Sequence, residues 1–190
     1  MNAYHRRLCA SPDWARFVED ALLPWGLEGV ELGDDVLEIG PGFGVTTRLL
    51  AQQVPRLTAL EVDDVFAERL RATTDASVEV VSGDGAAMPF PDNRFSAVVC
   101  FTMLHHVPSR TLQNRLFAQA CRVLRPGGVF AGTDSQSSWR FRLIHLFDTM
   151  VVVDPRTLPE RLRAAGLTDV CVDVDQSMRF RAFKPLMEER

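Results

Sequence analysis

The sequence predicts an α/β protein with a doubly wound, Rossmann-like sheet that is mostly parallel, has seven strands and includes an antiparallel strand in a C-terminal hairpin. Three observations support this fold. Short apolar runs typical of strands alternate with amphipathic helical segments along most of the chain. A glycine-rich loop follows the first run, and a tight turn joins the last two. Such alternation favours right-handed crossovers and a sheet covered by helices on both faces.

The first predicted element is a helix over residues 11–23. Ser11 suits the N-cap position and Pro12 the first turn. Its apolar face has helical spacing and consists of Trp14, Phe17, Val18, Ala21 and Leu22. A turn-rich stretch then leads into the first buried strand, over residues 36–39. This strand is followed by a glycine-rich loop and by a helix over about 45–53.

The same alternation continues towards the C-terminus. Further strands are predicted over 57–62, 78–82, 95–101 and 129–133, and further helices over 65–72 and 110–124. Thr157 with Glu160 three residues later has the pattern of a capping box, and the helix that it starts ends at Gly166. Strands over 169–175 and 178–183, joined by a two-residue turn, form the hairpin, so that an antiparallel strand ends an otherwise parallel sheet.

Length and composition indicate one ordinary globular domain over residues 1–190. The chain is 46% hydrophobic and 24% charged. A chain of this length buries a core but has no room for a separate substrate domain, so cofactor and substrate must share one scaffold. The formal net charge is −4, and no run of Lys and Arg has the density that a phosphate backbone requires. We therefore expect no nucleic-acid partner.

The cysteines and the N-terminus narrow the class of protein further. Cys9, Cys100, Cys121 and Cys171 are widely spaced and include no C-x-x-C pair, so we expect reduced, mostly buried thiols and no bound metal. No apolar stretch of a signal peptide follows the basic residues at the N-terminus, and no run of about 18 uncharged apolar residues occurs. These features favour a cytoplasmic protein without a membrane span.

A glycine-rich loop at the end of the first strand is the first candidate ligand site, because ligands of open α/β sheets bind beyond the carboxyl ends of the strands. Glu38 precedes Gly40, Gly42 and Gly44, whose spacing allows a sharp turn and a close approach of the backbone to a ligand. A dinucleotide fingerprint would require glycine at position 45, which is valine. This departure disfavours NAD.

Acidic residues end the next two strands. Glu61 can accept hydrogen bonds from both hydroxyls of a ribose, while Asp84 can accept one from an adenine amine and the Gly85 N–H can donate to a ring nitrogen. Simpler roles are open for each acid: Glu38 can bind loop amides, Glu61 and Asp63 can cap the next helix, and Asp84 can belong to an ordinary turn. Their joint occurrence at three successive strand ends favours an adenosine-bearing ligand.

Five segments together resemble the class I S-adenosylmethionine-dependent methyltransferases. The chain is most similar to the branch that includes the ubiquinone and menaquinone C-methyltransferases, over about residues 30–184. The segments are 36–44, 60–63, 83–92, 103–107 and 124–128. The resemblance implies S-adenosyl-L-methionine as the cofactor.

The resemblance also implies roles for individual residues. It implies that the loop residues Gly40, Pro41, Gly42 and Gly44 surround the methionine part of the cofactor. It also implies that Glu38 holds either the loop or the amino group of the cofactor. For the rest of the cofactor it implies Glu61 and Val62 at the ribose, Asp84 and the Gly85 amide at the adenine, and Phe101 beside the methionine chain and the sulfonium.

The loop after the fourth strand separates this chain from one related class. The ribosomal RNA adenine dimethylases share the Glu-Ile-Gly-Pro-Gly spelling, but they carry an Asn-Pro-Pro-Tyr type loop that holds a planar nitrogen. This chain has Phe101-Thr102-Met103-Leu104 at that place. The departure and the acidic net charge argue against methylation of nucleic-acid bases.

Histidines near the strand ends are candidate general bases for an acceptor that must lose a proton. His106 and His105 follow the fourth strand, and His145 is a further candidate. Each can instead be a capping or packing histidine, and methyl transfer needs no base when the acceptor carries no proton to lose.

Two segments are expected to cover the substrate. The first is an N-terminal helical cover over residues 1–30, around Tyr4, His5 and Arg7. The second, over 135–155, is strongly apolar and can be a lid over a lipophilic or aromatic acceptor, a buried helix or a dimer contact. Its apolar residues are Trp139, Phe141, Leu143, Ile144, Leu146, Phe147 and Met150, and its polar ones include Arg140, Arg142, His145 and Asp148.

The sequence therefore predicts an enzyme that transfers the methyl group of S-adenosylmethionine to a small-molecule acceptor by in-line displacement, as a monomer or a homodimer. Two other functions stay open at this point: an NAD(P)-dependent oxidoreductase, and a non-catalytic S-adenosylmethionine-binding protein that regulates a partner.

Overall fold

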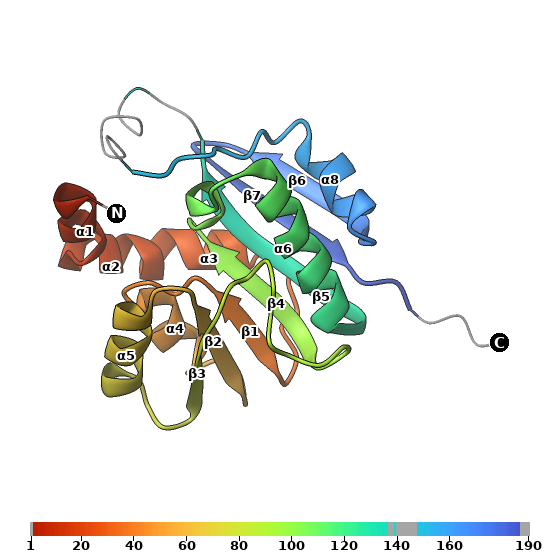
Figure 1. Cartoon of the computed structure of the whole chain (residues 1–190). Helices are drawn as coiled ribbons and strands as arrows, with labels where there is room; N and C mark the ends of the chain where they lie inside the picture. Colours follow the sequence, from red (N-terminus) through yellow and green to blue (C-terminus); the bar gives the residue numbers. More distant parts are fainter. Residues whose placement is uncertain (1, 137–138, 140–147, 187–190) are drawn as a thin grey trace.

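The computed structural model describes residues 2–136, 139 and 148–186, which build one seven-stranded sheet in the order β3-β2-β1-β4-β5-β7-β6 (Figure 1). The strands are β1 (Val36–Ile39), β2 (Leu57–Glu61), β3 (Val78–Ser82), β4 (Phe95–Phe101), β5 (Leu124–Ser135), β6 (Thr168–Val174) and β7 (Ser177–Phe183). The helices are α1 (Ala3–Cys9), α2 (Pro12–Phe17), η1 (Val18–Leu22), α3 (Leu23–Gly26), α4 (Val45–Leu50), α5 (Asp64–Thr73), η2 (Leu104–His106), α6 (Arg110–Val123) and α8 (Leu158–Ala164).

The pairing of the strands confirms the predicted fold class. Strands β3, β2, β1, β4 and β5 are parallel neighbours, whereas β7 is antiparallel to both β5 and β6. The expectation that the antiparallel strand ends the sheet was wrong, because β7 lies inside the sheet and β6 forms the edge. The physical reason is burial: β7 buries Met178, Phe180 and Ala182, whereas no residue of β6 is fully buried. The more apolar strand takes the inner position.

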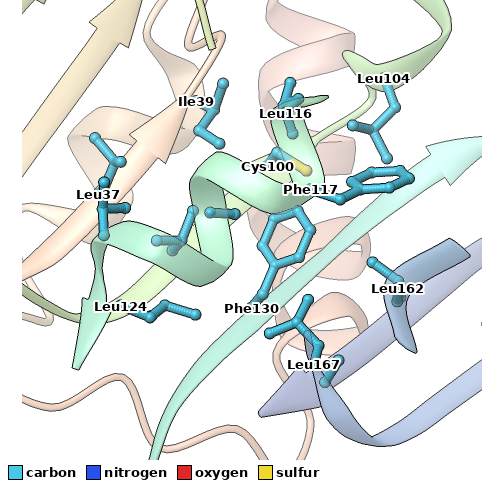
Figure 2. Packing of buried hydrophobic residues seen from close by; sticks show 14 of the residues in the cluster. Leu37, Ile39, Cys100, Leu104, Leu116, Phe117, Leu124, Phe130, Leu162 and Leu167 are labelled. Carbon is cyan, nitrogen blue, oxygen red and sulfur yellow. The ribbon is translucent and has the colours of Figure 1, made fainter. Parts of the chain in front are cut away.

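Hydrophobic residues fill both faces of the sheet. On one face, α6 and α8 contribute side chains such as Leu116 and Leu162 to a cluster with Phe130 of β5. Figure 2 shows Phe117 of this cluster beside Phe130 and Cys100. On the other face, Leu23 of α3 and Leu50 of α4 pack against the strands. Each large side chain removed from water in this way contributes about 1.5–3 kcal/mol to the stability of the fold. The two helical layers cover the faces of the sheet, so the ends of the strands remain available for a ligand site.

The N-terminal helix differs from the predicted one. Ser11 caps it as expected, with its Oγ accepting the Trp14 N–H at 3.1 Å. The helix continues beyond residue 23 to Gly26, and its middle segment η1 is a π-helix in which the Leu23 N–H donates to the Val18 carbonyl. Pro24 explains the wider turn, because it has no N–H and its ring crowds the carbonyl four residues earlier. The preceding helix α1 lies within the expected N-terminal helical cover over residues 1–30, but its bounds were not predicted, because its seven residues carry no apolar period.

Two smaller expectations were also wrong. Thr157 does not cap α8 with its side chain: its backbone is already helical, and its hydroxyl donates to the Asp154 carbonyl at 3.2 Å. The Asp154 carboxylate instead accepts the Arg156 N–H at 2.9 Å, so an Asx-type turn starts the helix. The cysteines are free, but among them Cys100 alone is buried, because the others lie at the margins of the packed layers.

None of the helices within the described ranges has the length and hydropathy that crossing a membrane requires.

Candidate active site

A cavity of about 430 Å³ lies where the carboxyl ends of β1, β2, β4 and β5 meet the N-terminal helices. The strand order reverses between β1 and β4, which is the usual place for a ligand in an open α/β sheet. The cavity is lined by residues from the N-terminal helices, the strand ends and the loops after them. These residues are His5, Leu8, Cys9, Trp14, Val18, Leu22, Gly40, Pro41, Gly42, Phe43, Val45, Thr46, Glu61, Val62, Asp63, Phe66, Phe101, Thr102, Met103, His105, His106, Ser135 and Thr149. The size is that of a typical small-molecule site.

The glycine loop after β1 forms one wall of the cavity. Gly40, Gly42 and Gly44 have φ angles of +67°, +53° and +71°, which side chains rarely adopt. A Cβ at Gly42 would meet no atom within 4 Å, so the backbone there faces open space in the cavity. A Cβ at Gly44 would instead collide with Leu70. Gly42 therefore keeps the cavity open, and Gly44 lets α4 pack against α5.

Glu61 joins the tips of β1 and β2. One carboxylate oxygen accepts the Gly42 N–H and the other accepts the Asp63 N–H, both at 3.0 Å. Glu61 is only 5% exposed yet lines the cavity. A carboxylate has about four lone-pair positions, so Glu61 can hold the loop and still accept hydroxyl donors from a ligand. Asp63 has the simpler role, because its side chain accepts the Val65 and Phe66 N–H groups at the start of α5.

Glu38 lies behind the glycine loop and is fully buried. The hydroxyls of Thr46 and Thr47 in α4 donate to its carboxylate, the latter at 2.6 Å. Burial raises the pKa of Glu38 from 4.5 to about 7 despite these two hydrogen bonds. Glu38 is not part of the cavity lining as the described residues define it. Its contacts tie β1 to the first turn of α4 and so fix the loop between them.

The end of β3 does not reach the cavity in the part of the chain that is described. Asp84 accepts the Ala86 N–H with its side chain at 2.8 Å and the Ala87 N–H with its carbonyl at 2.9 Å, as an ordinary turn does. Gly85 is needed for packing, since a Cβ there would lie 3.0 Å from Leu116 and 3.1 Å from Ile39.

The opposite wall of the cavity carries two histidines on the short helix η2. His105 is 2% exposed, and its Nδ1 lies 2.5 Å from an oxygen of Asp134, a fully buried residue of β5. His106 is half-buried, and its ring centroid lies 4.2 Å from that of His105. Both histidines line the cavity, as the sequence suggested, but the buried carboxylate beside His105 was not predicted.

A third histidine comes from the N-terminal helix α1. The ring of His5 stacks on His106 with 5.2 Å between centroids, and its Nδ1 lies 3.2 Å from an oxygen of Asp148. Burial lowers the pKa of His5 below its ordinary value, against the opposing effect of Asp148. Three imidazoles from two distant segments thus lie side by side at one end of the cavity.

The structure describes the expected N-terminal cover almost completely, but only part of the expected cover over residues 135–155. Residues of α1, α2 and η1 contribute six members of the cavity lining, which are His5, Leu8, Cys9, Trp14, Val18 and Leu22. From the segment 135–155, Ser135 and Thr149 line the cavity, and Trp139 is 69% exposed. The predicted candidates Arg140, Phe141, Arg142, Leu143, Ile144, His145, Leu146 and Phe147 lie outside the described residues.

Asp134 is the functional candidate that sequence reasoning missed. It lies 29 positions from His105 in the chain and belongs to a strand whose burial gave no reason to single it out. The one available signal was a lone acid within a buried strand, since acids are almost never fully buried without a partner. In the residues that the structure covers, no group of three or more His, Cys, Asp and Glu side chains is arranged to hold a metal ion.

Comparisons with known proteins identify the family to which the chain is similar. A family model described as "Methyltransferase domain" matches residues 37–132, from β1 into β5. The chain is 32% identical over 156 residues to 27-O-demethylrifamycin SV methyltransferase of Amycolatopsis mediterranei, a match that covers 77% of this chain and 51% of that protein.

A second curated relative is the ubiquinone/menaquinone biosynthesis C-methyltransferase UbiE of Pseudomonas savastanoi pv. phaseolicola. The identity is 31% over 123 residues, which cover 60% of this chain and 44% of that protein. The chain thus spans about half the length of the curated relatives it matches. Among solved structures, a SAM-dependent methyltransferase from Aquifex aeolicus superposes with a TM-score of 0.73 at 17% identity, covering 96% of this chain and 98% of that one.

Proposed function

The chain belongs to the class I S-adenosylmethionine-dependent methyltransferases, and from this premise we propose that its cavity binds S-adenosylmethionine and directs the methyl group to a small-molecule acceptor. The observation that carries the proposal is the open backbone at Gly42 next to the Glu61 carboxylate. A wall without a side chain beside a carboxylate with spare lone pairs suits a ligand that presents ribose hydroxyls.

The proposed cofactor site uses the residues at the ends of β1, β2 and β4. Next to the methionine part we place Gly40, Pro41, Gly42 and Phe101, all of which line the cavity. Glu61 and Val62, also in the lining, would meet the ribose.

Four further residues have an indirect or peripheral place in the proposal. Glu38 and Gly44 would act indirectly, because their contacts fix the loop and α4. Asp84 and Gly85 would receive the adenine at the end of β3, the neighbour of β2 in the sheet.

S-adenosylmethionine supplies a methyl group bonded to a positively charged sulfur. That charge disappears during in-line displacement, so a dry cavity favours the transition state over the ground state. The chain supplies such surroundings with the aromatic and apolar residues Trp14, Phe43, Phe66, Phe101 and Met103. The task of the protein is to hold donor and acceptor in line and to keep water out.

The acceptor in this proposal is small and lipophilic or aromatic, because apolar side chains make up much of the lining. Where its nucleophile carries a proton, His106 or His105 would take it, since both line the cavity. The rifamycin derivative and the quinones named for the two relatives are of this kind. We further propose a cytoplasmic monomer or homodimer that does not act on nucleic acid, in keeping with a net charge of −4.

Calorimetry tests the cofactor proposal directly. S-adenosylhomocysteine titrated into the protein should bind with a Kd in the micromolar range, about −8 kcal/mol, and should raise the unfolding temperature. NAD and NADP should do neither, and binding of these nucleotides without S-adenosylhomocysteine would favour the oxidoreductase instead. Release of S-adenosylhomocysteine with a panel of phenols, quinols and macrocyclic alcohols distinguishes an enzyme from a regulatory protein that only binds the cofactor.

A further inference from the structure

A glutamine interrupts the buried apolar face of α6. Gln113 is fully buried, and the other buried residues of the helix are Leu116, Phe117, Ala120 and Val123. Polar side chains at such positions are rare and need hydrogen-bond partners, because burial removes their contacts with water. Gln113 does not line the cavity as the described residues define it, so it can influence the site only through its neighbours.

The side-chain amide of Gln113 joins two segments of the cavity wall. Its nitrogen donates to the Leu104 carbonyl of η2 at 3.0 Å and to the Val151 carbonyl at 2.7 Å, so both hydrogens of the amide are used. The Val151 N–H donates in turn to the His105 carbonyl at 2.8 Å. Val151 is therefore bound to η2 both directly and through Gln113, two positions after Thr149, which lines the cavity.

A buried arginine fixes the orientation of this amide. Arg161 is 9% exposed and belongs to α8, which lies beside α6 (Figure 1). Its guanidinium donates to the Gln113 amide oxygen at 2.8 Å and to the Asn114 amide oxygen at 2.7 Å. A flipped Gln113 amide would turn its NH₂ group toward this cation and its oxygen toward two carbonyls, so the contacts are compatible with one orientation only.

The charge of Arg161 is not balanced by an acid. Within the described residues no carboxylate forms an ion pair with it. Burial, together with the positive charge of Arg110, lowers the pKa of Arg161 below its ordinary value. A buried cation among neutral groups is unfavourable, and a methionine could fill the same space without this cost. A hydrogen bond from a cation is, however, stronger than a neutral one and polarises its acceptor, so Arg161 strengthens both N–H bonds that Gln113 donates.

Building on the proposed function, we propose that Gln113, held by Arg161, is a positioning residue for the methyl acceptor. Its two N–H bonds fix η2 relative to the segment 149–151, and both η2 and Thr149 line the cavity at the proposed acceptor end. The proposed cofactor end does not depend on these bonds, because the Glu61 carboxylate holds the Gly42 N–H from the neighbouring strand. Loss of the Gln113 bonds therefore weakens acceptor binding selectively.

The test replaces the amide by a carboxylate of nearly the same shape. Gln113→Glu keeps an acceptor for Arg161, but an ionised carboxylate cannot donate to the Leu104 and Val151 carbonyls. Protein saturated with S-adenosylhomocysteine is titrated with 2-naphthol, a small aromatic compound, in a calorimeter. Gln113→Glu should weaken 2-naphthol binding about tenfold, while the Kd of S-adenosylhomocysteine should change by less than about threefold. A residue that only supports the fold would not separate the two affinities.

The same helix offers a matched control. The amide oxygen of Gln119 also accepts from an arginine, Arg122, at 2.8 Å, but Gln119 has no contact with η2 and does not line the cavity among the residues described. Gln119→Glu should change neither affinity. Arg161→Met removes the charge and leaves Gln113 in place, so it should weaken 2-naphthol binding about fourfold. If Gln113→Glu fails to fold, Arg161→Met carries the same comparison of the two ligands.

The possible results separate this inference from the proposed function on which it rests. Unchanged 2-naphthol affinity in Gln113→Glu, equal losses for the two ligands, or the same loss in Gln119→Glu would each overturn the inference and leave the cofactor site intact. Binding of S-adenosylhomocysteine without any binding of 2-naphthol to the unmodified protein would overturn the proposed acceptor class, and the inference with it. Absence of S-adenosylhomocysteine binding would instead overturn the proposed function itself.

Discussion

The two ends of the cavity are built in different ways. The proposed cofactor end consists of the backbone over residues 40–44 and of Glu61. The carboxylate of Glu61 accepts a hydrogen bond from the Gly42 N–H, which lies 19 positions earlier in the sequence. The proposed acceptor end consists of side chains from α1, η2, β5 and the segment after it, and the His5–Asp148 contact spans 143 positions. In the proposed function, a locally encoded backbone loop holds the cofactor, whereas the proposed acceptor surface is assembled by the tertiary fold and can vary without disturbing that loop.

Two buried acids express the same difference in energetic terms. Glu38, at the cofactor end, has both oxygens bound by hydroxyls of one adjacent helix. Asp134, at the acceptor end, has one oxygen bound by His105 and one without a partner among the residues described. The satisfied acid fixes a loop, whereas the incompletely satisfied one leaves a buried acceptor oxygen unpaired, which is energetically unfavourable.

The sharpest way to break the comparison is to add a side chain to the backbone wall. Gly42→Val should weaken binding of S-adenosylhomocysteine by about 1,000-fold, because valine strains a backbone with φ +53° and fills the open space of the cavity. The fold should persist, as judged by circular dichroism. Gly127→Val is the matched control, since Gly127 also has a positive φ, +77°, but lies away from the cavity. Equal affinity in both variants would contradict the proposed site.

A second prediction concerns the buried acid of the cofactor end. The pKa of Glu38 is raised from 4.5 to about 7, so the folded state holds a proton that the unfolded state releases between these values. Stability should therefore fall by about 3 kcal/mol as the pH rises through this window. Glu38→Gln cannot ionise and should remove this part of the pH dependence. Urea unfolding of both proteins between pH 4.5 and pH 7 checks it, and parallel curves would contradict it.

Substitution of Glu61, the carboxylate that joins β1 and β2, should weaken cofactor binding less than substitution of Gly42 does. Glu61→Ala removes the acceptor of the Gly42 and Asp63 amides together with the proposed ribose contact. We expect S-adenosylhomocysteine to bind about 30-fold more weakly, or about 2 kcal/mol. Glu61→Gln keeps one acceptor oxygen, so its affinity for S-adenosylhomocysteine should lie between those of Glu61→Ala and the unmodified protein. Calorimetry with adenosine alone sharpens the assignment, because the loss should persist for this fragment if Glu61 meets the ribose.

The smallest effect is expected at the acceptor end. His5→Ala removes the contact with Asp148 and the stack on His106, which should destabilise α1 locally by about 1 kcal/mol. Hydrogen exchange of the α1 amides should accelerate, while S-adenosylhomocysteine affinity should change by less than about threefold. Arg7→Ala, an exposed change in the same helix, should leave the exchange rates nearly unchanged. A large loss of cofactor affinity in His5→Ala would show that the two ends are not independent.

Local patterns predicted the central sheet well. The strand over 36–39 and the strand over 78–82 have the predicted bounds, and the hairpin at the C-terminus is present. These elements are short apolar or alternating runs bounded by turn residues, which leave few other structures open. The errors occurred where a longer-range effect decided: Pro24 widened the N-terminal helix into a π-turn, and burial placed β7 inside the sheet.

The sequence by itself determined the order of strands and helices, the left-handed loop at Gly40–Gly44 and the acid at the end of β2, because each depends on neighbouring residues and on backbone geometry. The tertiary structure alone decided that His105 meets Asp134 and that His5 joins His106. Contacts of this kind depend on how distant segments are packed, and packing leaves no local signature in the chain.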